Sequence, residues 1–245
     1  MQITRRNSPN HNVGRQGWTP DFIVCHTTGG TTAGAIDWST PRPGESVEAY
    51  HRRVPANDRV SYHFIVAQNG TTTQTVDITN TAWANGTAND NGNRDNRHST
   101  ITAVRERRVN ANQYTISIGF GDMNLNSWRL TQQQIDTAAT LLRHIQSEVN
   151  KLYGHTIPFT RNNIIGHNQI TPITRPDCPG RNFQFNEILA ILNAPTSPSD
   201  GVADWAREAW NWAVAAKITD GTRPTENLTR QEAMTLLHRF YNHIR

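Results

Sequence analysis

The stretch that most restricts the possible fold and function of this chain runs from residue 164 to residue 180. It contains an apolar run, a glycine, His167, a loop with two prolines, and then Cys178, which a third proline follows. The two residues are too far apart for one helical face, but a loop that folds back brings them together. Imidazole nitrogen and thiolate sulfur are favoured zinc ligands, and prolines restrict such a loop before the metal arrives. The pair therefore indicates a zinc site. The alternative is a hydrogen-bonded loop histidine and a buried cysteine.

A second candidate ligand stands at the end of a predicted strand. The apolar run 22–25 stops at His26, which a glycine-rich loop follows. Strand alternation places Cys25 in the core and His26 on the opposite face. A set of His26, His167 and Cys178 would leave the fourth tetrahedral position open, as in a catalytic zinc site. The alternative for His26 alone is a hydrogen-bonded histidine at a strand end.

Composition narrows the class of protein. With 245 residues and 35% hydrophobic content, the chain has room for one sizeable domain and a small second one. No run approaches ~18 apolar residues, so no membrane insertion is expected. The N-terminus lacks the apolar core of a signal peptide, which predicts synthesis in the cytoplasm without one. The net charge of +4 favours anionic polymers, but the arginines form no dense run, so nucleic acid is not an expected partner. Two cysteines make a disulfide framework unlikely.

The remaining patterns alternate between β-prone runs and helical periods. They predict a hairpin of strands 60–67 and 71–76 around Asn-Gly, a strand at 114–120, and helices at 45–57, 131–150 and 183–192. Residues 1–20 are predicted to be irregular. Residues 77–112 are predicted to form a long surface loop that lines a substrate groove.

In this order the motifs resemble the zinc-dependent N-acetylmuramoyl-L-alanine amidases. These are the type 2 amidases of phage endolysins and autolysins, related to the peptidoglycan recognition proteins and the T7-type phage lysozymes. The resemblance covers roughly residues 1–193. It implies an α/β fold with a mixed central β-sheet flanked by helices. It also implies Zn²⁺ in a surface groove and hydrolysis, in bacterial peptidoglycan, of the amide between N-acetylmuramic acid and L-alanine of the stem peptide.

The resemblance also assigns roles to residues. His26, His167 and Cys178 match the family's zinc ligands, and Tyr62 matches a tyrosine that orients the water or substrate. The alternative for Tyr62 is a strand residue that packs beside Phe64.

Arg175 lies near the position where many members carry a lysine that stabilises an oxyanion. In the T7-like pattern that lysine stands two residues before the cysteine, whereas Arg175 stands three before it. His63 lies on the other face by alternation and is predicted to be structural.

Two departures from the family pattern concern the catalytic groove. Many members carry Ser-Ile-Glu where this chain has Gly119, so the glutamate often treated as general base is missing. Tyr62 and zinc could suffice, Asp122 could substitute, or activity could be weak. The family's Ala-Trp-His-Ala-Gly motif is replaced at residues 82–86 by Ala-Trp-Ala-Asn-Gly, which removes a substrate-contacting histidine.

The C-terminal part is predicted to be a separate small domain. A Pro/Ser-rich linker covers 194–201, and residues 202–245 predict two helices, at 202–217 and after a capping box at 229–232. This segment resembles one S-layer homology repeat, which implies binding to a cell-wall polymer. Its tryptophans are alternatively core residues or the surface of a homodimer formed through this tail.

Two functions from different classes therefore remain. The first is a lytic zinc amidase, an endolysin with a wall-binding tail. The second is a non-catalytic peptidoglycan-binding protein of the same fold. Such a protein would normally have lost a zinc ligand, commonly the cysteine, and here all three matching residues are present.

Overall fold

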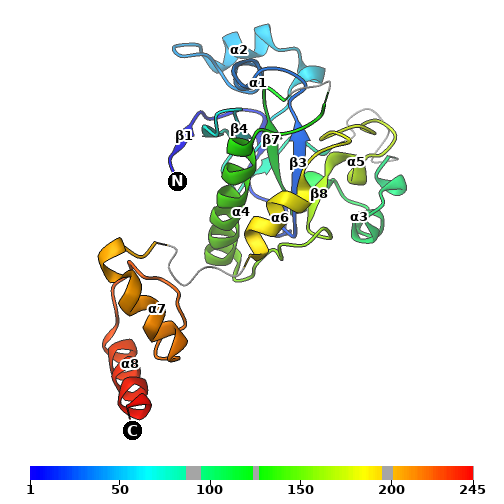
Figure 1. Cartoon of the computed structure of the whole chain (residues 1–245). Coiled ribbons are helices and arrows are strands. Elements are labelled where there is room, and N and C mark those ends of the chain that lie inside the picture. The colour runs from blue at the N-terminus through cyan, green and yellow to red at the C-terminus, as the bar shows by residue number, and fades with distance from the viewer. Residues whose placement is uncertain (87–94, 124–126, 195–200, 245) are drawn as a thin grey trace. The chain divides into compact units, whose positions relative to one another are not determined.

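The computed structural model describes residues 1–86, 95–123, 127–194 and 201–244. The chain forms two compact units, Met1–Leu192 and Asn193–Arg245. In the first unit a six-stranded sheet has the order β1-β5-β4-β7-β3-β8 (Figure 1). These strands are β1 Ile3–Arg5, β3 Phe22–Thr27, β4 Phe64–Val66, β5 Thr72–Gln74, β7 Thr115–Phe120 and β8 Ile164–Gly166. The predicted α/β class, a mixed sheet flanked by helices, is confirmed.

The only antiparallel pair of this sheet is the hairpin of β4 and β5, in which Val66 opposes Thr72. Its Asn-Gly turn is the predicted one, and the Asn69 side chain accepts a hydrogen bond from the Thr71 amide at 3.0 Å. The strand begins later than predicted, so Tyr62 lies just before β4.

One face of the sheet is covered by two helices that Figure 1 shows next to each other, α4 Gln132–Tyr153 and α6 Phe185–Asn193. The apolar stripe predicted for residues 131–150 packs on the sheet, with Ile135, Leu142 and Ile145 fully buried. Cys25 belongs to this same core, as strand alternation predicts.

The opposite face carries a second core that the sequence did not predict. Phe22 and Val24 of β3 pack there with Val104, Ala111 and Tyr114. These last three come from α3 Thr102–Arg107 and η3 Ala111–Tyr114. The prediction of one long surface loop over 77–112 was therefore wrong where these helices form. The apolar residues here are too few and too scattered to show a period. Residues 87–94 of that loop lie outside the described part.

Short elements complete this unit: the antiparallel pair β2 His11–Asn12 and β6 Thr81–Ala82, the helices α1 Thr32–Ser39, α2 Val47–Arg53 and α5 His167–Ile170, and the 3-10 turns η1 Ala56–Asp58 and η2 Asp95–His98. Helix α2 corresponds to the helix predicted over 45–57, and its Tyr50 is buried. The strands β1 and β2 correct the prediction that residues 1–20 are irregular.

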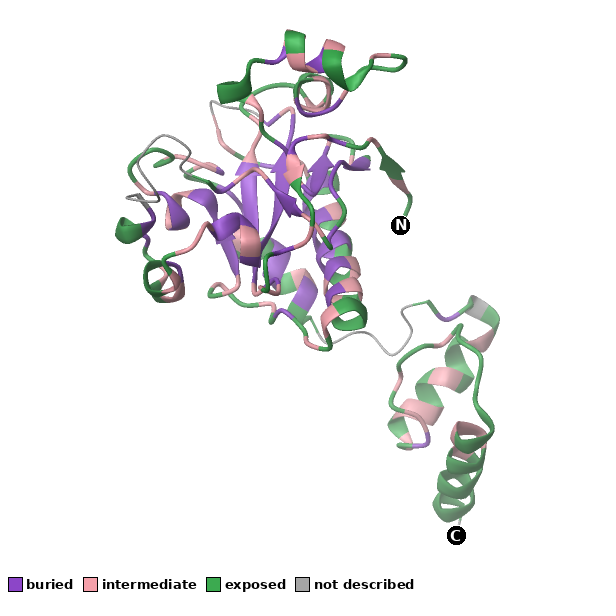
Figure 2. Ribbon diagram, turned by 180° about the vertical axis from the view of Figure 1, so that it is seen from behind, coloured by how far each residue is buried: buried purple, intermediate pink, exposed green. Residues whose placement is uncertain are grey.

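The second unit contains η4 Asp204–Ala206, α7 Arg207–Ala215 and α8 Arg230–His243. The predicted capping box is present between Thr229 and Glu232. Figure 2 colours most of this unit as exposed. Val202 and Ile218 are its buried apolar residues among those described.

The predicted linker 194–201 falls mostly on residues 195–200, which lie outside the described part. In the part of the chain that the structure describes, no helix is long and apolar enough to cross a membrane.

Candidate metal centre

His26 is held on an inner strand of the sheet, between β7 and the edge strand β8. It stands near the end of β3, directly opposite Gly119 of β7, and is buried. Strand alternation directs its side chain to the face away from α4, while Cys25 enters the α4 core. A strand with neighbours on both sides gives this imidazole a rigid backbone.

His167 reaches the same place from the adjacent strand. Strand β8 pairs with β3 and ends at Gly166, and His167 then begins the single turn of α5. The Gln169 side chain accepts a hydrogen bond from the Gly166 amide at 3.0 Å and closes this turn. The helix therefore begins at the point where the histidine must leave the sheet.

Cys178 returns to this point through the proline-rich loop. Its carbonyl accepts a hydrogen bond from the Asn168 amide at 2.8 Å, and its own amide donates to Arg175 at 3.3 Å. A Cβ atom on Gly166 would lie 2.7 Å from Cδ of Pro179, so only glycine permits this close approach. The Gly-His and Cys-Pro-Gly motifs are thus parts of one packed unit.

The three predicted ligand side chains converge. One donor atom from each of His26, His167 and Cys178 lies within 4.8 Å of the other two. The Cys178 sulfur is 3.8 Å from Nδ1 of His26, and the two imidazole rings are 4.5 Å apart between centroids. Two imidazole nitrogens and one thiolate form a donor set that suits zinc and leaves a tetrahedral position for another ligand.

Burial and neighbouring charges shift the pKa values of two of the three candidate ligands. Burial lowers the pKa of His26 well below its ordinary value, and the neighbouring His167 lowers it further. The imidazole is therefore neutral, the form that binds metal. Burial raises the pKa of the Cys178 thiol to about 11, against a hydrogen bond from the Thr27 amide and the charge of Arg175. A bound cation would favour the thiolate.

Tyr62 lies beside this cluster. Its ring is 5.4 Å from that of His26, in an edge-to-face arrangement. Burial raises the pKa of the Tyr62 hydroxyl, so it stays protonated at neutral pH and can donate a hydrogen bond. A Cβ atom on Gly119 would be 3.1 Å from the Tyr62 ring. The ring therefore occupies the space beside the position where many amidases carry a glutamate.

Arg175 is exposed on the loop that carries Cys178, and its guanidinium donates to the Thr174 carbonyl at 2.8 Å. Its charge lowers the pKa values of His26 and Cys178.

Two further residues considered from the sequence have other partners. His63 is buried away from the cluster, where its Nδ1 accepts a hydrogen bond from the Ser117 amide at 3.0 Å. The predicted structural role of His63 agrees with this contact. Asp122 accepts a hydrogen bond from the Thr32 hydroxyl at 2.5 Å.

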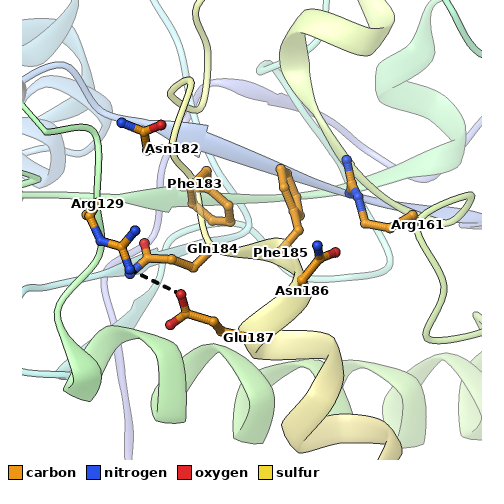
Figure 3. Close-up of a pocket in the computed structure, with 8 residues that line it drawn as sticks. All are labelled: Arg129, Arg161, Asn182, Phe183, Gln184, Phe185, Asn186 and Glu187. Carbon is orange, nitrogen blue, oxygen red and sulfur yellow. Dashed lines mark hydrogen bonds and ion pairs between the residues drawn. The ribbon is translucent and has the colours of Figure 1, made fainter.

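A separate surface pocket of about 340 Å³ lies where α6 begins (Figure 3). Arg129 pairs there with Glu187 at 3.1 Å. The Arg161 guanidinium lies 3.6 Å from the centre of the Phe185 ring and also donates to Gln169. Both cations are engaged by protein groups, and none of the lining residues belongs to the metal cluster.

The structure adds one residue that the sequence did not single out. Asn85 is completely buried, and its side chain donates hydrogen bonds to hydroxyls of Thr115 and Ser117 on β7. In the sequence it is noticeable only as a departure from a family motif, and its contacts with β7 could not be derived from its position.

The chain is similar to a known protein family and to several solved structures. Residues 16–181 match the Amidase_2 family, described as N-acetylmuramoyl-L-alanine amidase. A solved structure of an AmpD selenomethionine derivative is similar at 22% identity and a TM-score of 0.52, over 78% of this chain and 94% of that one. The amidase LysC from Clostridium intestinale URNW matches at 18% identity and a TM-score of 0.48, over 80% of this chain and 99% of that one. No curated protein sequence matches. Because the family match spans well over half of the residues, the chain belongs to the N-acetylmuramoyl-L-alanine amidase family.

Proposed function

We propose that this amidase is a zinc-dependent peptidoglycan hydrolase of the endolysin type. It cleaves the amide between N-acetylmuramic acid and L-alanine, with Zn²⁺ held by His26, His167 and Cys178. The observation that supports this most is the convergence of three donor atoms from β3, α5 and the proline loop. A non-catalytic binding protein has no need of a complete ligand set, so the enzyme is favoured.

When bound, zinc lowers the pKa of a water molecule and polarises the scissile carbonyl. The chain's own groups supply orientation and charge. Tyr62 presents a protonated hydroxyl beside His26, suited to hydrogen bond with the water or the substrate carbonyl. Arg175 adds a cation at the edge of the cluster, where negative charge develops on the carbonyl oxygen.

The second unit is proposed to bind a bacterial cell-wall polymer. This rests on its resemblance to an S-layer homology repeat and on its exposed aromatic residues. Trp205 is 90% exposed and Trp212 48% exposed. Side chains of this kind suit a sugar polymer, but they would equally suit a homodimer formed through this unit. The enzyme would then act at the cell wall, with peptidoglycan as its substrate.

The metal assignment is tested with a matched pair of cysteine variants. Cys178→Ala should lose zinc, as measured by elemental analysis after dialysis, and should lose lytic activity. Cys25→Ala makes the same change on the other face of β3 and should keep both. Mass spectrometry of digested peptidoglycan should show free stem peptides with an N-terminal L-alanine. Full zinc content in Cys178→Ala would contradict the ligand set. Products cut elsewhere would contradict the reaction.

A further inference from the structure

Asn85 occupies a buried position that is unusually well determined for a loop residue. Its amide and that of Ala84 both donate to Oδ1 of Asn112, at 2.5 and 3.1 Å. Its side-chain nitrogen donates to the hydroxyls of Thr115 and Ser117, each at 2.8 Å. Hydrogen bonds therefore fix both the backbone and the side chain of Asn85.

The hydroxyl of Thr115 decides which way the Asn85 amide points. That hydroxyl donates its single hydrogen to the Ala111 carbonyl at 2.8 Å. It can then only accept a hydrogen bond from Asn85, so the atom next to it must be the amide nitrogen. The carbonyl oxygen Oδ1 consequently faces the other way. It is buried and forms no well-shaped hydrogen bond among the described residues.

The register of the sheet places this amide on the side of His26. Thr115, Ser117 and Gly119 alternate onto one face of β7. Gly119 is the direct neighbour of His26 on β3, so the two hydroxyls that hold Asn85 lie on the face that carries the His26 ring.

The two imidazole nitrogens of His26 have different surroundings. Nδ1 faces the Cys178 sulfur at 3.8 Å. Nε2 is buried and, like Oδ1 of Asn85, forms no well-shaped hydrogen bond among the described residues. Both of these buried atoms therefore belong to side chains on the same face of the sheet.

We infer that Asn85 is a positioning residue whose Oδ1 accepts a hydrogen bond from the Nε2–H of His26 and so directs the Nδ1 lone pair at the metal. This inference rests on the metal site proposed above. A histidine that binds metal through one nitrogen commonly donates its other N–H to a fixed acceptor, which determines the tautomer and the ring orientation. In this protein the fixed acceptor would be the neutral side-chain amide of Asn85, which two hydroxyls of β7 hold in place.

Zinc affinity, measured by competition with a chelator, provides the first test. Asn85→Leu keeps the shape but removes the acceptor, and it should weaken zinc binding by roughly 10- to 100-fold. Ser61→Ala is the matched control, because the Ser61 hydroxyl accepts from the Trp83 amide at 2.9 Å and anchors the same loop without touching Asn85. It should retain nearly wild-type affinity.

The tautomer of His26 in the metal-free wild-type protein provides a second test that needs no variant. Long-range proton–nitrogen NMR spectra should show the hydrogen on Nε2. A hydrogen on Nδ1, or unchanged zinc affinity in folded Asn85→Leu, would overturn the inference. Equal losses in Asn85→Leu and Ser61→Ala would also overturn it, since loop stability would then explain both. Failure of the wild-type protein to bind zinc would instead refute the proposed metal site itself.

Discussion

The side chain missing at Gly119 explains the position of Tyr62. A Cβ atom there would approach the Tyr62 ring to 3.1 Å and the Thr28 methyl group to 3.2 Å, which is tighter than ordinary contacts. A glutamate could therefore enter this position only if the tyrosine moved. If the chain hydrolyses peptidoglycan as proposed, a group other than a glutamate at this position must orient the water.

Tyr62→Phe tests whether the hydroxyl is that group. The variant keeps the ring packing against Gly119 and removes only the oxygen. Turnover of a soluble muropeptide should fall by roughly 100-fold, in line with the loss of one positioned catalytic group, while zinc content stays the same. Undiminished turnover would direct the search to Asp122, through Asp122→Asn.

His63 makes stability depend on pH. Burial lowers its pKa to about 3, and the charge of Arg15 contributes, with Nη2 of Arg15 3.0 Å from Nε2. The folded state thus binds fewer protons on this group than the unfolded chain, whose histidines titrate near their ordinary pKa of about 6.5. The stabilisation is complete above that pH and is lost as the pH falls towards 3.

Urea unfolding at several pH values should reveal this loss. Between pH 6.5 and 3 the wild type should lose up to about 1.4 kcal/mol per pH unit more than His63→Gln, which cannot take up the proton. Other buried histidines titrate in both proteins and cancel in the comparison. Parallel pH profiles would show that His63 is not held neutral by the fold.

At the scale of elements, the first turn of α4 makes hydrogen bonds both within the helix and to the sheet. The Thr131 hydroxyl accepts from the Gln134 amide at 3.2 Å, and the Gln134 side chain accepts from the Thr131 amide at 3.1 Å. The same Gln134 side chain donates to the Gly121 carbonyl just beyond β7 at 2.8 Å. The capping box therefore also attaches the helix to the sheet.

Removing the cap should have a measurable cost. Thr131→Ala should lower the free energy of unfolding by about 1 kcal/mol, because an N-terminal amide of the helix loses its acceptor. Thr140→Ala, an exposed site in the middle of the same helix, should change it by less than about 0.5 kcal/mol. Equal effects in the two variants, measured by urea unfolding, would argue against the cap.

At the scale of the whole molecule, the two units differ in how they can be stable. Both buried clusters lie in the first unit, whereas the second exposes apolar residues along α8, including Met234 at 63% and Leu237 at 58%. Residues 201–245 carry six Lys/Arg against five Asp/Glu. Attraction of this unit to the wall should therefore depend on shape and aromatic contacts more than on charge.

A chain that ends at Asn193 tests this division of labour. It should cleave soluble muropeptides at nearly the wild-type rate, because the metal centre and both cores remain. It should bind purified walls poorly at high salt, where charge attraction is screened, and should lyse intact cells slowly. Wall binding equal to that of the full chain would leave self-association as the role of the second unit, which sedimentation would measure.

Local patterns alone were enough to predict the strand that ends at His26, the Asn-Gly hairpin and helix α4. Each depends on residues close in sequence, where period and turn chemistry are read directly. The residue types around the proline-rich loop indicated His167 and Cys178 as candidate ligands, and the family resemblance matched them, although their packing through Gly166 became visible only in the structure.

Contacts between distant segments were decided by the tertiary structure. The helix α3, the ring of Tyr62 over Gly119, and the direction of the Asn85 amide each depend on partners far away in the chain. Asn85, for example, is oriented by a hydroxyl of β7 whose own hydrogen is committed to the Ala111 carbonyl. No local period encodes such a hydrogen bond, because it exists only after the sheet has brought the segments together.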